Sequence, residues 1–151
     1  DVAPSRGLGD VYKRQVQCKA VEELVRNSDI ICTTTPSTTP VLPDDKELLR
    51  GKCIIAIGSY MPEMREIPDA VLDLVDNVYI ELPYACEESG DLSQPLASGK
   101  LTKDRVKLMH EYLVSGEKEI KEGQTTYFKS VGMGLFDVCI AQKLYEVAKE
   151  K

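Results

Sequence analysis

The chain has 151 residues, of which 42% are hydrophobic and 29% charged, and its formal net charge is −6. This length and composition indicate one globular domain with a sizeable core. The acidic balance, without a basic cluster, argues against a nucleic-acid surface. No apolar stretch approaches the roughly 20 residues that span a bilayer, so no membrane association is expected.

The first fifteen residues, "DVAPSRGLGDVYKRQ", differ from the rest of the chain. They have no starting Met and no usable periodicity, and a proline and two glycines fall close together. The stretch also resembles the translated read-through of a sequencing-library adapter. We therefore interpret residues 1–15 as a non-native or disordered tail without function, and residues 16–151 as the folded part.

Helical and extended patterns alternate after this tail. Residues 18–27 have apolar positions at helical spacing with acids early and Arg late, which predicts a helix. The run "DIICTTT" at 29–35 is short, apolar and β-branched, which predicts a buried strand. A short helix that ends in Gly is expected over 42–51, and a second buried strand over 52–58.

The alternation continues in the second half. An early Pro in an apolar-periodic segment predicts a helix over 67–76, and a third strand follows at 77–82. A Thr that can cap and an early Asp predict a helix over 101–116. A fourth strand at 125–131 precedes a long amphipathic helix at 134–151.

This order of elements predicts a parallel sheet covered on both faces, because its strands read as continuous apolar runs between helices. The long segment 83–100 is either a lid-like functional loop or a partly helical connection.

The five cysteines are widely scattered and show no metal-ligand spacing, so no metal site is expected. Cys32 and Cys53 lie inside apolar runs, where a thiol packs as a small hydrophobe, and we predict that both are buried. No secretory segment opens the chain, and the predicted compartment is the reducing cytoplasm. The single histidine, His110, has charged neighbours and is expected at the surface.

Ligands of an open parallel sheet bind outside the carboxyl ends of its strands. The segments that follow the four predicted strands are all dense in hydroxyls, glycines and turn residues: 33–40, 58–66, 83–91 and 129–134. One such segment is ordinary turn chemistry, whereas four at one edge favour a binding site. Arg65 and Glu66, within "GSYMPEMRE", are interpreted as a surface ion pair.

Four motifs together resemble the second half of the ornithine cyclodeaminase/μ-crystallin family: "DIICTTTPSTTPVL", "GKCIIAIGSYMPEMREI", "ESGDL" and "YFKSVGMGLFDVCIAQKLYE". The resemblance runs from about Val16 to the end of the chain. It implies an α/β fold with a partial Rossmann-like, doubly wound, mostly parallel sheet and flanking helices that lacks its first strands. "VQC" at 16–18 would then end the third strand of that fold without a partner.

The resemblance also implies ligands and partners. The cofactor would be NAD or NADP, with the glycine-rich phosphate turn expected before residue 16, and the substrate a small imino or amino acid. By the resemblance, the chain would be the carboxyl-terminal half of a longer parent protein, which would be a homodimer formed through an amino-terminal domain.

By the same resemblance, six residues are assigned to the cofactor: Thr35, Ser37, Ile57, Gly58, Glu88 and Ser130. Tyr60 and Val131 are assigned to the substrate side, and no catalytic residue is identified. At Gly58, the missing Cβ would allow a close approach to the cofactor.

Tyr60 separates the branches of this family. Cyclodeaminases carry an Asp at the matching position that handles the substrate amine and the attacking water, which a phenol with a pKa near 10 does not readily do. A Lys of that branch is replaced by Met64. Both differences favour a reductase of cyclic imines, in which hydride is delivered to a C=N carbon.

Two alternatives for the parent stay open: an ornithine cyclodeaminase, and a non-catalytic μ-crystallin-like protein that holds NADPH and a small ligand. We expect the 151-residue chain alone to be inactive.

Overall fold

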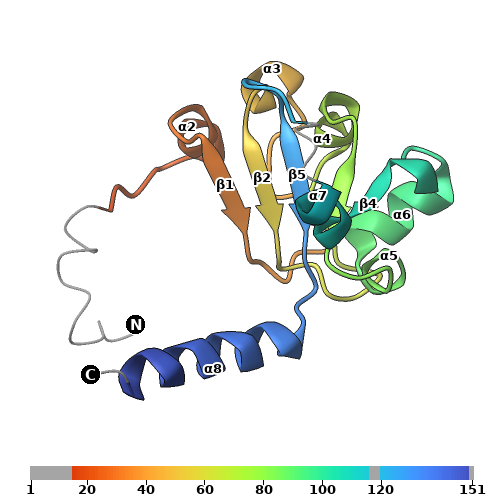
Figure 1. Cartoon of the computed structure of the whole chain (residues 1–151). Helices are drawn as coiled ribbons and strands as arrows, with labels where there is room; N and C mark the ends of the chain where they lie inside the picture. Colours follow the sequence, from red (N-terminus) through yellow and green to blue (C-terminus); the bar gives the residue numbers. More distant parts are fainter. Residues whose placement is uncertain (1–14, 116–119, 150–151) are drawn as a thin grey trace.

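A single sheet of five parallel strands forms the centre of the computed structural model, which describes residues 15–115 and 120–149. The strand order is β1-β2-β5-β3-β4, and Figure 1 shows the strands side by side with their carboxyl ends at one edge. Their bounds are Ile30–Thr33 (β1), Cys53–Ala56 (β2), Val78–Ile80 (β3), Val106–Leu108 (β4) and Thr126–Lys129 (β5). The predicted α/β fold with a parallel sheet is confirmed, while residues 1–14 of the expected tail lie outside the described residues.

Helices connect and flank these strands. Their bounds are Val21–Arg26 (α2), Lys46–Leu49 (α3), Asp69–Leu74 (α4), Ala85–Glu88 (α5), Gly90–Ser98 (α6), Met109–Ser115 (α7) and Gly134–Lys149 (α8). The segment 83–100 is the partly helical connection, because α5 and α6 occupy most of it. Ser89 begins α6 by accepting a hydrogen bond from the main-chain N–H of Asp91, an ordinary amino-terminal cap.

The helix predicted over 101–116 is wrong in its first half. A 3-10 turn at Lys103–Arg105 leads into β4, and only then does α7 begin. The Arg105 guanidinium donates to the main-chain oxygens of Leu72 and Val75, both at 2.6 Å, and so fixes the turn against the end of α4. The next three residues pair with β3, and this tertiary pairing overrides their local helical pattern.

One face of the sheet is buried. Alternate residues of β1, β2 and β5 point into it, and they pack against α3, α4, α5 and α6. The most deeply buried members of this core include Leu49, Ile54, Val71, Ala85, Leu92 and Tyr127. The core therefore lies between the sheet and the helices of one layer.

The opposite face is covered only in part by the described residues. Over β3, the ring of Tyr79 packs on Tyr112 of α7 at 5.1 Å between centroids. Over β1, Ile30 is 65% exposed and Cys32 is exposed. The expected coverage on both faces thus holds at β3 and is wrong at β1. The predicted burial of both thiols is also wrong, because Cys32 and the half-buried Cys53 point to this open face.

The predicted carboxyl-terminal helix is present as α8, whose described residues include no buried side chain. Figure 1 shows α8 running beneath the carboxyl edge of the sheet. His110 is exposed, as expected, and residues 16–18 form no strand. None of the helices within the described ranges has the length and apolarity needed to cross a membrane.

We expect the 151-residue chain to self-associate through β1. This strand is at the sheet edge, its outer face is apolar, and unpaired strand edges template pairing between chains. Ile30→Lys should reduce the association measured by sedimentation velocity, since a charge on an edge strand blocks pairing. Val16→Lys, at an 85% exposed position outside the sheet, is the matched control. Wild-type protein that stays monomeric on concentration would contradict this expectation.

Candidate functional site

The residues predicted from three strand ends lie together at the carboxyl edge of the sheet. Thr35 follows β1, Gly58 follows β2 and Ser130 follows β5, and these strands are neighbours. A Cβ built on Gly58 would collide with the main-chain N and O of Thr35. The main-chain N–H of Ser130 donates to the carbonyl oxygen of Ala56 at 2.9 Å. We call the segments 34–37, 57–60 and 130–132 the rim.

The other predicted site residues differ in their exposure. Ile57 and Tyr60 are 43% and 51% exposed at the end of β2, so both are open to a ligand. Ser37 is half-buried, and its hydroxyl donates to the carbonyl oxygen of Thr39 at 2.6 Å. Val131 is half-buried against the core. Glu88, in α5, is half-buried, and within the described part of the chain its side chain makes none of the hydrogen bonds that join the rim.

Glu66 lies on the core side of the rim and is fully buried. Its Oε1 accepts from the main-chain N–H of Thr35 at 2.5 Å. Its Oε2 accepts from the Thr33 hydroxyl at 2.8 Å and from the Gly58 N–H at 2.9 Å. The interpretation of residues 65 and 66 as a surface ion pair is therefore wrong: Arg65 pairs with Asp69 instead, and Glu66 joins the ends of β1 and β2.

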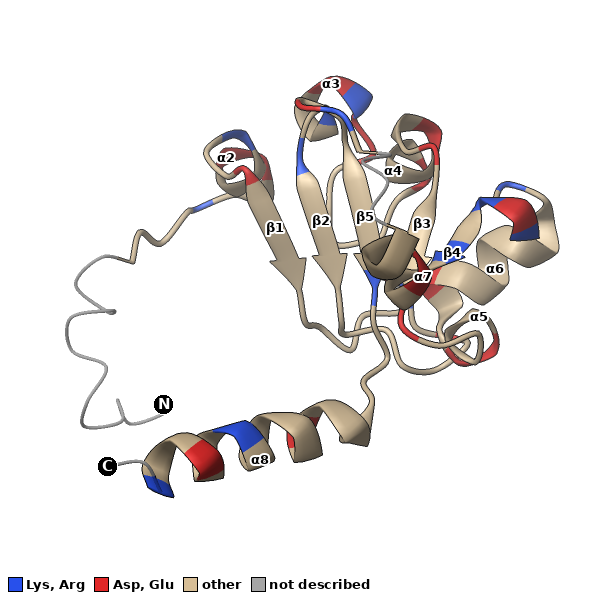
Figure 2. Ribbon diagram, in the orientation of Figure 1, with Lys and Arg blue, Asp and Glu red and all other residues tan. Residues whose placement is uncertain are grey.

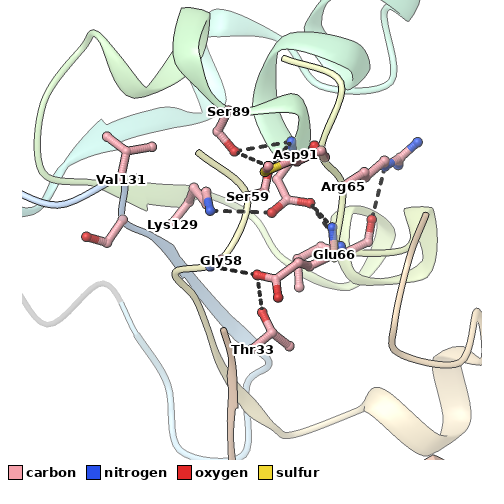
Figure 3. A network of polar contacts seen from close by, with 12 residues as sticks. Thr33, Gly58, Ser59, Arg65, Glu66, Ser89, Asp91, Lys129 and Val131 are labelled. Carbon is pink, nitrogen blue, oxygen red and sulfur yellow. Dashed lines mark hydrogen bonds and ion pairs between the residues drawn. The ribbon is translucent and has the colours of Figure 1, made fainter. Parts of the chain in front are cut away.

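A buried ion pair between Asp91 and Lys129 lies next to Glu66 (Figure 3). Oδ1 of Asp91 accepts from the main-chain N–H groups of Glu66 at 2.7 Å and Ile67 at 2.9 Å. Oδ2 of Asp91 lies 3.5 Å from Nζ of Lys129, with neither side chain exposed. This is longer than the roughly 2.7–2.9 Å of a charge-assisted hydrogen bond, so the pair is held mainly by charge.

Burial shifts the pKa values of this pair in opposite directions. It raises the pKa of the Asp91 carboxyl and lowers the pKa of the Lys129 ammonium, because a low-dielectric interior disfavours the charged form of each. Each group's charge favours the charged form of the other, and so counters both pKa shifts. Breaking the pair by removing one partner would leave an uncompensated charge in the core.

Glu81 holds the third rim segment. It follows β3 directly and is 6% exposed. Its Oε1 accepts from the Ser130 hydroxyl at 2.8 Å and from the main-chain N–H groups of Val131 at 2.6 Å and Gly132 at 2.9 Å. The loop after β5 is therefore fixed by one carboxylate, as the loops after β1 and β2 are.

Sequence reasoning missed four residues of the site: Glu66, Glu81, Asp91 and Lys129. The available signal was position, since Glu81 directly follows an apolar strand and Lys129 ends one in alternation with buried Tyr127.

The exposed part of the rim differs in character from these four buried charged residues. Segments 34–43 and 57–62 contain no charged residue, and Figure 2 shows the loops below β1 and β2 in tan. Hydroxyl, main-chain and apolar groups there suit the binding and orientation of a ligand.

A parallel sheet with flanking helices and a candidate site outside its carboxyl ends defines a Rossmann-like α/β domain. The family model of ornithine cyclodeaminase/mu-crystallin matches residues 8–151, and the chain belongs to this family. The match begins inside the segment that we interpreted as a tail.

Three similar proteins illustrate this relationship. The Δ(1)-pyrroline-2-carboxylate reductase of Bacillus cereus is 37% identical over 136 residues, which are 88% of this chain and 41% of the relative. The structure of a probable ornithine cyclodeaminase from Bordetella pertussis Tohama I has a TM-score of 0.77 and 28% identity, covering 99% of this chain and 50% of that one.

A third similar structure is the Thermococcus litoralis Δ(1)-pyrroline-2-carboxylate reductase in complex with NADH and L-proline. It has a TM-score of 0.75 and 24% identity, with 88% of this chain and 42% of that one covered, and it supports the fold. The chain thus spans about two fifths of the length of the curated relative described above, at 41%.

Proposed function

We propose that this chain forms the nicotinamide end of the coenzyme site in an NAD(P)-dependent reductase that acts on the C=N bond of a small cyclic imino acid. The supporting observation is the convergence of Thr35, Gly58 and Ser130 at one edge, in a chain 37% identical to a pyrroline-carboxylate reductase. In this proposal residues 16–151 are the carboxyl-terminal part of the Rossmann domain with its final helix.

The rim fits the uncharged end of such a coenzyme. Ile57 offers exposed apolar surface beside Gly58, and the surrounding loop segments carry no charge. We assign Thr35, Ser37 and Ser130 to hydroxyl and main-chain contacts with the coenzyme. Glu88 is assigned to its periphery, because the adjacent Ser89 contacts Ser59 of the loop after β2.

On the substrate side, we assign Tyr60 and Val131. The bound coenzyme would supply the hydride for the C=N carbon, while these residues orient the imine against it. The exposed phenol of Tyr60 can donate a hydrogen bond to a substrate, and Val131 offers apolar contact beside Ser130. The homodimer through the amino-terminal domain and the cytoplasmic location stay predictions.

A similar structure described as a probable ornithine cyclodeaminase makes ammonia release the main alternative. Tyr60 and Met64 argue against it, because neither side chain offers the carboxylate or ammonium expected for that chemistry.

We expect the full-length protein to oxidise NADH or NADPH only when a cyclic imine such as pyrroline-2-carboxylate is added. Coenzyme absorbance is the measurement, and an ammonia assay with ornithine is the parallel test. Ammonia release from ornithine would reverse the choice of branch. Tight binding of NADPH and a small ligand without turnover of either substrate would support the ligand-holding alternative instead.

A further inference from the structure

We propose that Glu66 and Glu81 are positioning residues of the rim: two buried carboxylates that fix the loops after β1, β2 and β5 where the strand ladder ends. The role in coenzyme binding rests on the proposed function, whereas the positioning itself rests on contacts within the chain. Each carboxylate accepts three hydrogen bonds from neighbouring strands or their loops.

The Glu66 carboxylate accepts hydrogen bonds just beyond the point where the main-chain hydrogen bonds between β1 and β2 end. The last β1–β2 bond of the ladder runs from the Ile57 N–H to the carbonyl oxygen of Thr33 at 2.9 Å. Beyond it, the N–H groups of Thr35 and Gly58 both point to Glu66. One side chain therefore sets the separation of two rim segments whose main chains are already in contact at Gly58.

Glu81 repeats this arrangement at the neighbouring strands β5 and β3. The β3–β5 register ends with Ile80 opposite Lys129, and Glu81 is the next residue of its strand. Its carboxylate accepts from the N–H groups of Val131 and Gly132, the residues just beyond Ser130. The loops after β1, β2 and β5 are thus hydrogen-bonded on the side that faces the core, which leaves their outer surfaces free for a ligand.

The two positions differ in how their donors are shared. At Glu66 the donors are divided between both carboxylate oxygens, so an amide of the same shape would turn its NH₂ group toward an N–H or O–H. At Glu81 all three donors meet Oε1, so a Gln amide oxygen could still accept from them and only removal of the acceptor breaks the contact. Lys129 of β5 offsets part of this negative charge, because its ammonium pairs with Asp91 and also interacts electrostatically with Glu66 and Glu81. Glu66→Gln is therefore a nearly isosteric change that selectively disturbs the rim, whereas at Glu81 the informative change is Glu81→Met, which removes the acceptor.

Amide hydrogen exchange of the 151-residue chain, followed by NMR, tests the positioning. In wild-type protein the amides of Thr35, Gly58, Val131 and Gly132 should exchange slowly, although they lie outside the strands. Glu66→Gln should accelerate exchange at Thr35 and Gly58 by roughly tenfold or more, the effect of losing a hydrogen bond to a charged group. Glu81→Met, which removes the acceptor, should do the same at Val131 and Gly132.

Internal references and a surface variant separate this effect from general destabilisation. The amides of Ile57 and Ser130 donate to main-chain oxygens and should keep their wild-type rates in both variants. Glu47→Gln, on the exposed surface of α3, should leave all these amides unchanged. Fast exchange of the four rim amides in wild-type protein would overturn the proposal even if neither variant folded.

Coenzyme affinity of the full-length protein then tests the link to function. Glu66→Gln and Glu81→Met should each raise the KM for the coenzyme by roughly tenfold, and Glu47→Gln should not. Accelerated rim exchange with unchanged coenzyme KM would refute the rim as the coenzyme site, while the positioning would stand. Unchanged exchange would refute the positioning whatever the coenzyme result.

Discussion

Lys129→Met should destabilise the chain by about 3–5 kcal/mol, because it leaves the Asp91 carboxylate buried without its counter-charge. Met preserves the length and apolar stem of the side chain, so the change isolates the ammonium group. Urea denaturation followed by circular dichroism gives the free energy of unfolding directly. A loss of this size lowers the Tm of a domain this large by roughly 10 °C.

The same substitution at the surface is the control. Lys100 pairs with Asp73 at 2.6 Å, but the Lys100 side chain is 33% exposed and solvent screens the pair, so Lys100→Met should lower stability far less than Lys129→Met. Adding Asp91→Asn to Lys129→Met should recover part of the loss, since the Asn oxygen still accepts from the N–H groups of Glu66 and Ile67. Equal effects of the two Lys→Met changes would refute the buried pair as a stabilising contact.

The loss caused by Lys129→Met should shrink as the pH falls. Burial already raises the pKa of Asp91 above its unfolded value, and removing the nearby ammonium raises it further. A carboxyl whose folded pKa is raised contributes most stability below its unfolded pKa and loses that contribution as the pH rises through the folded pKa. The variant should therefore regain stability relative to wild type on acidification toward the unfolded pKa. A deficit that is constant with pH would contradict this account.

The sheet and its rim were predictable because their signals are local. Runs such as "IICT" and "CIIA" are apolar and β-branched, and parallel strands necessarily bring their carboxyl ends to one edge. The convergence of Thr35, Gly58 and Ser130 follows from that geometry. β4 was missed because it is only three residues long, and its pairing with β3 decides its conformation.

The buried charges were not predictable from local pattern. Charged residues are rarely buried, so the sequence places Glu66 at the surface. Its burial depends on partners as distant as Thr33, which lies 33 positions away, and on Asp91, which lies 25 positions away. From the sequence, the missing side chain of Gly58 was explained by a close approach of the coenzyme. The structure adds a second reason for a glycine there, because a Cβ would collide with the main chain of Thr35.

Gly58→Ala should destabilise the chain by about 3 kcal/mol and separate the loops after β1 and β2. The added Cβ would meet the main-chain N and O of Thr35 and lie 2.6 Å from Oε1 of Glu66. A collision with backbone cannot be relieved by rotating a side chain, so the effect belongs at the upper end of the 1–3 kcal/mol typical of overpacking. Urea denaturation measures the loss, and exchange of the Gly58 amide reports whether its bond to Glu66 is broken.

Gly134→Ala is the matched control, because a Cβ there meets no atom within 4 Å. It lies at the start of α8, where Ala is the better helix former by up to about 1 kcal/mol, so this change should be neutral or stabilising. In the full-length protein, Gly58→Ala should also weaken coenzyme binding, because the loops that it separates are two of the three rim segments. Wild-type stability and wild-type coenzyme affinity in Gly58→Ala would show that the contact between Thr35 and Gly58 neither stabilises the fold nor shapes the rim.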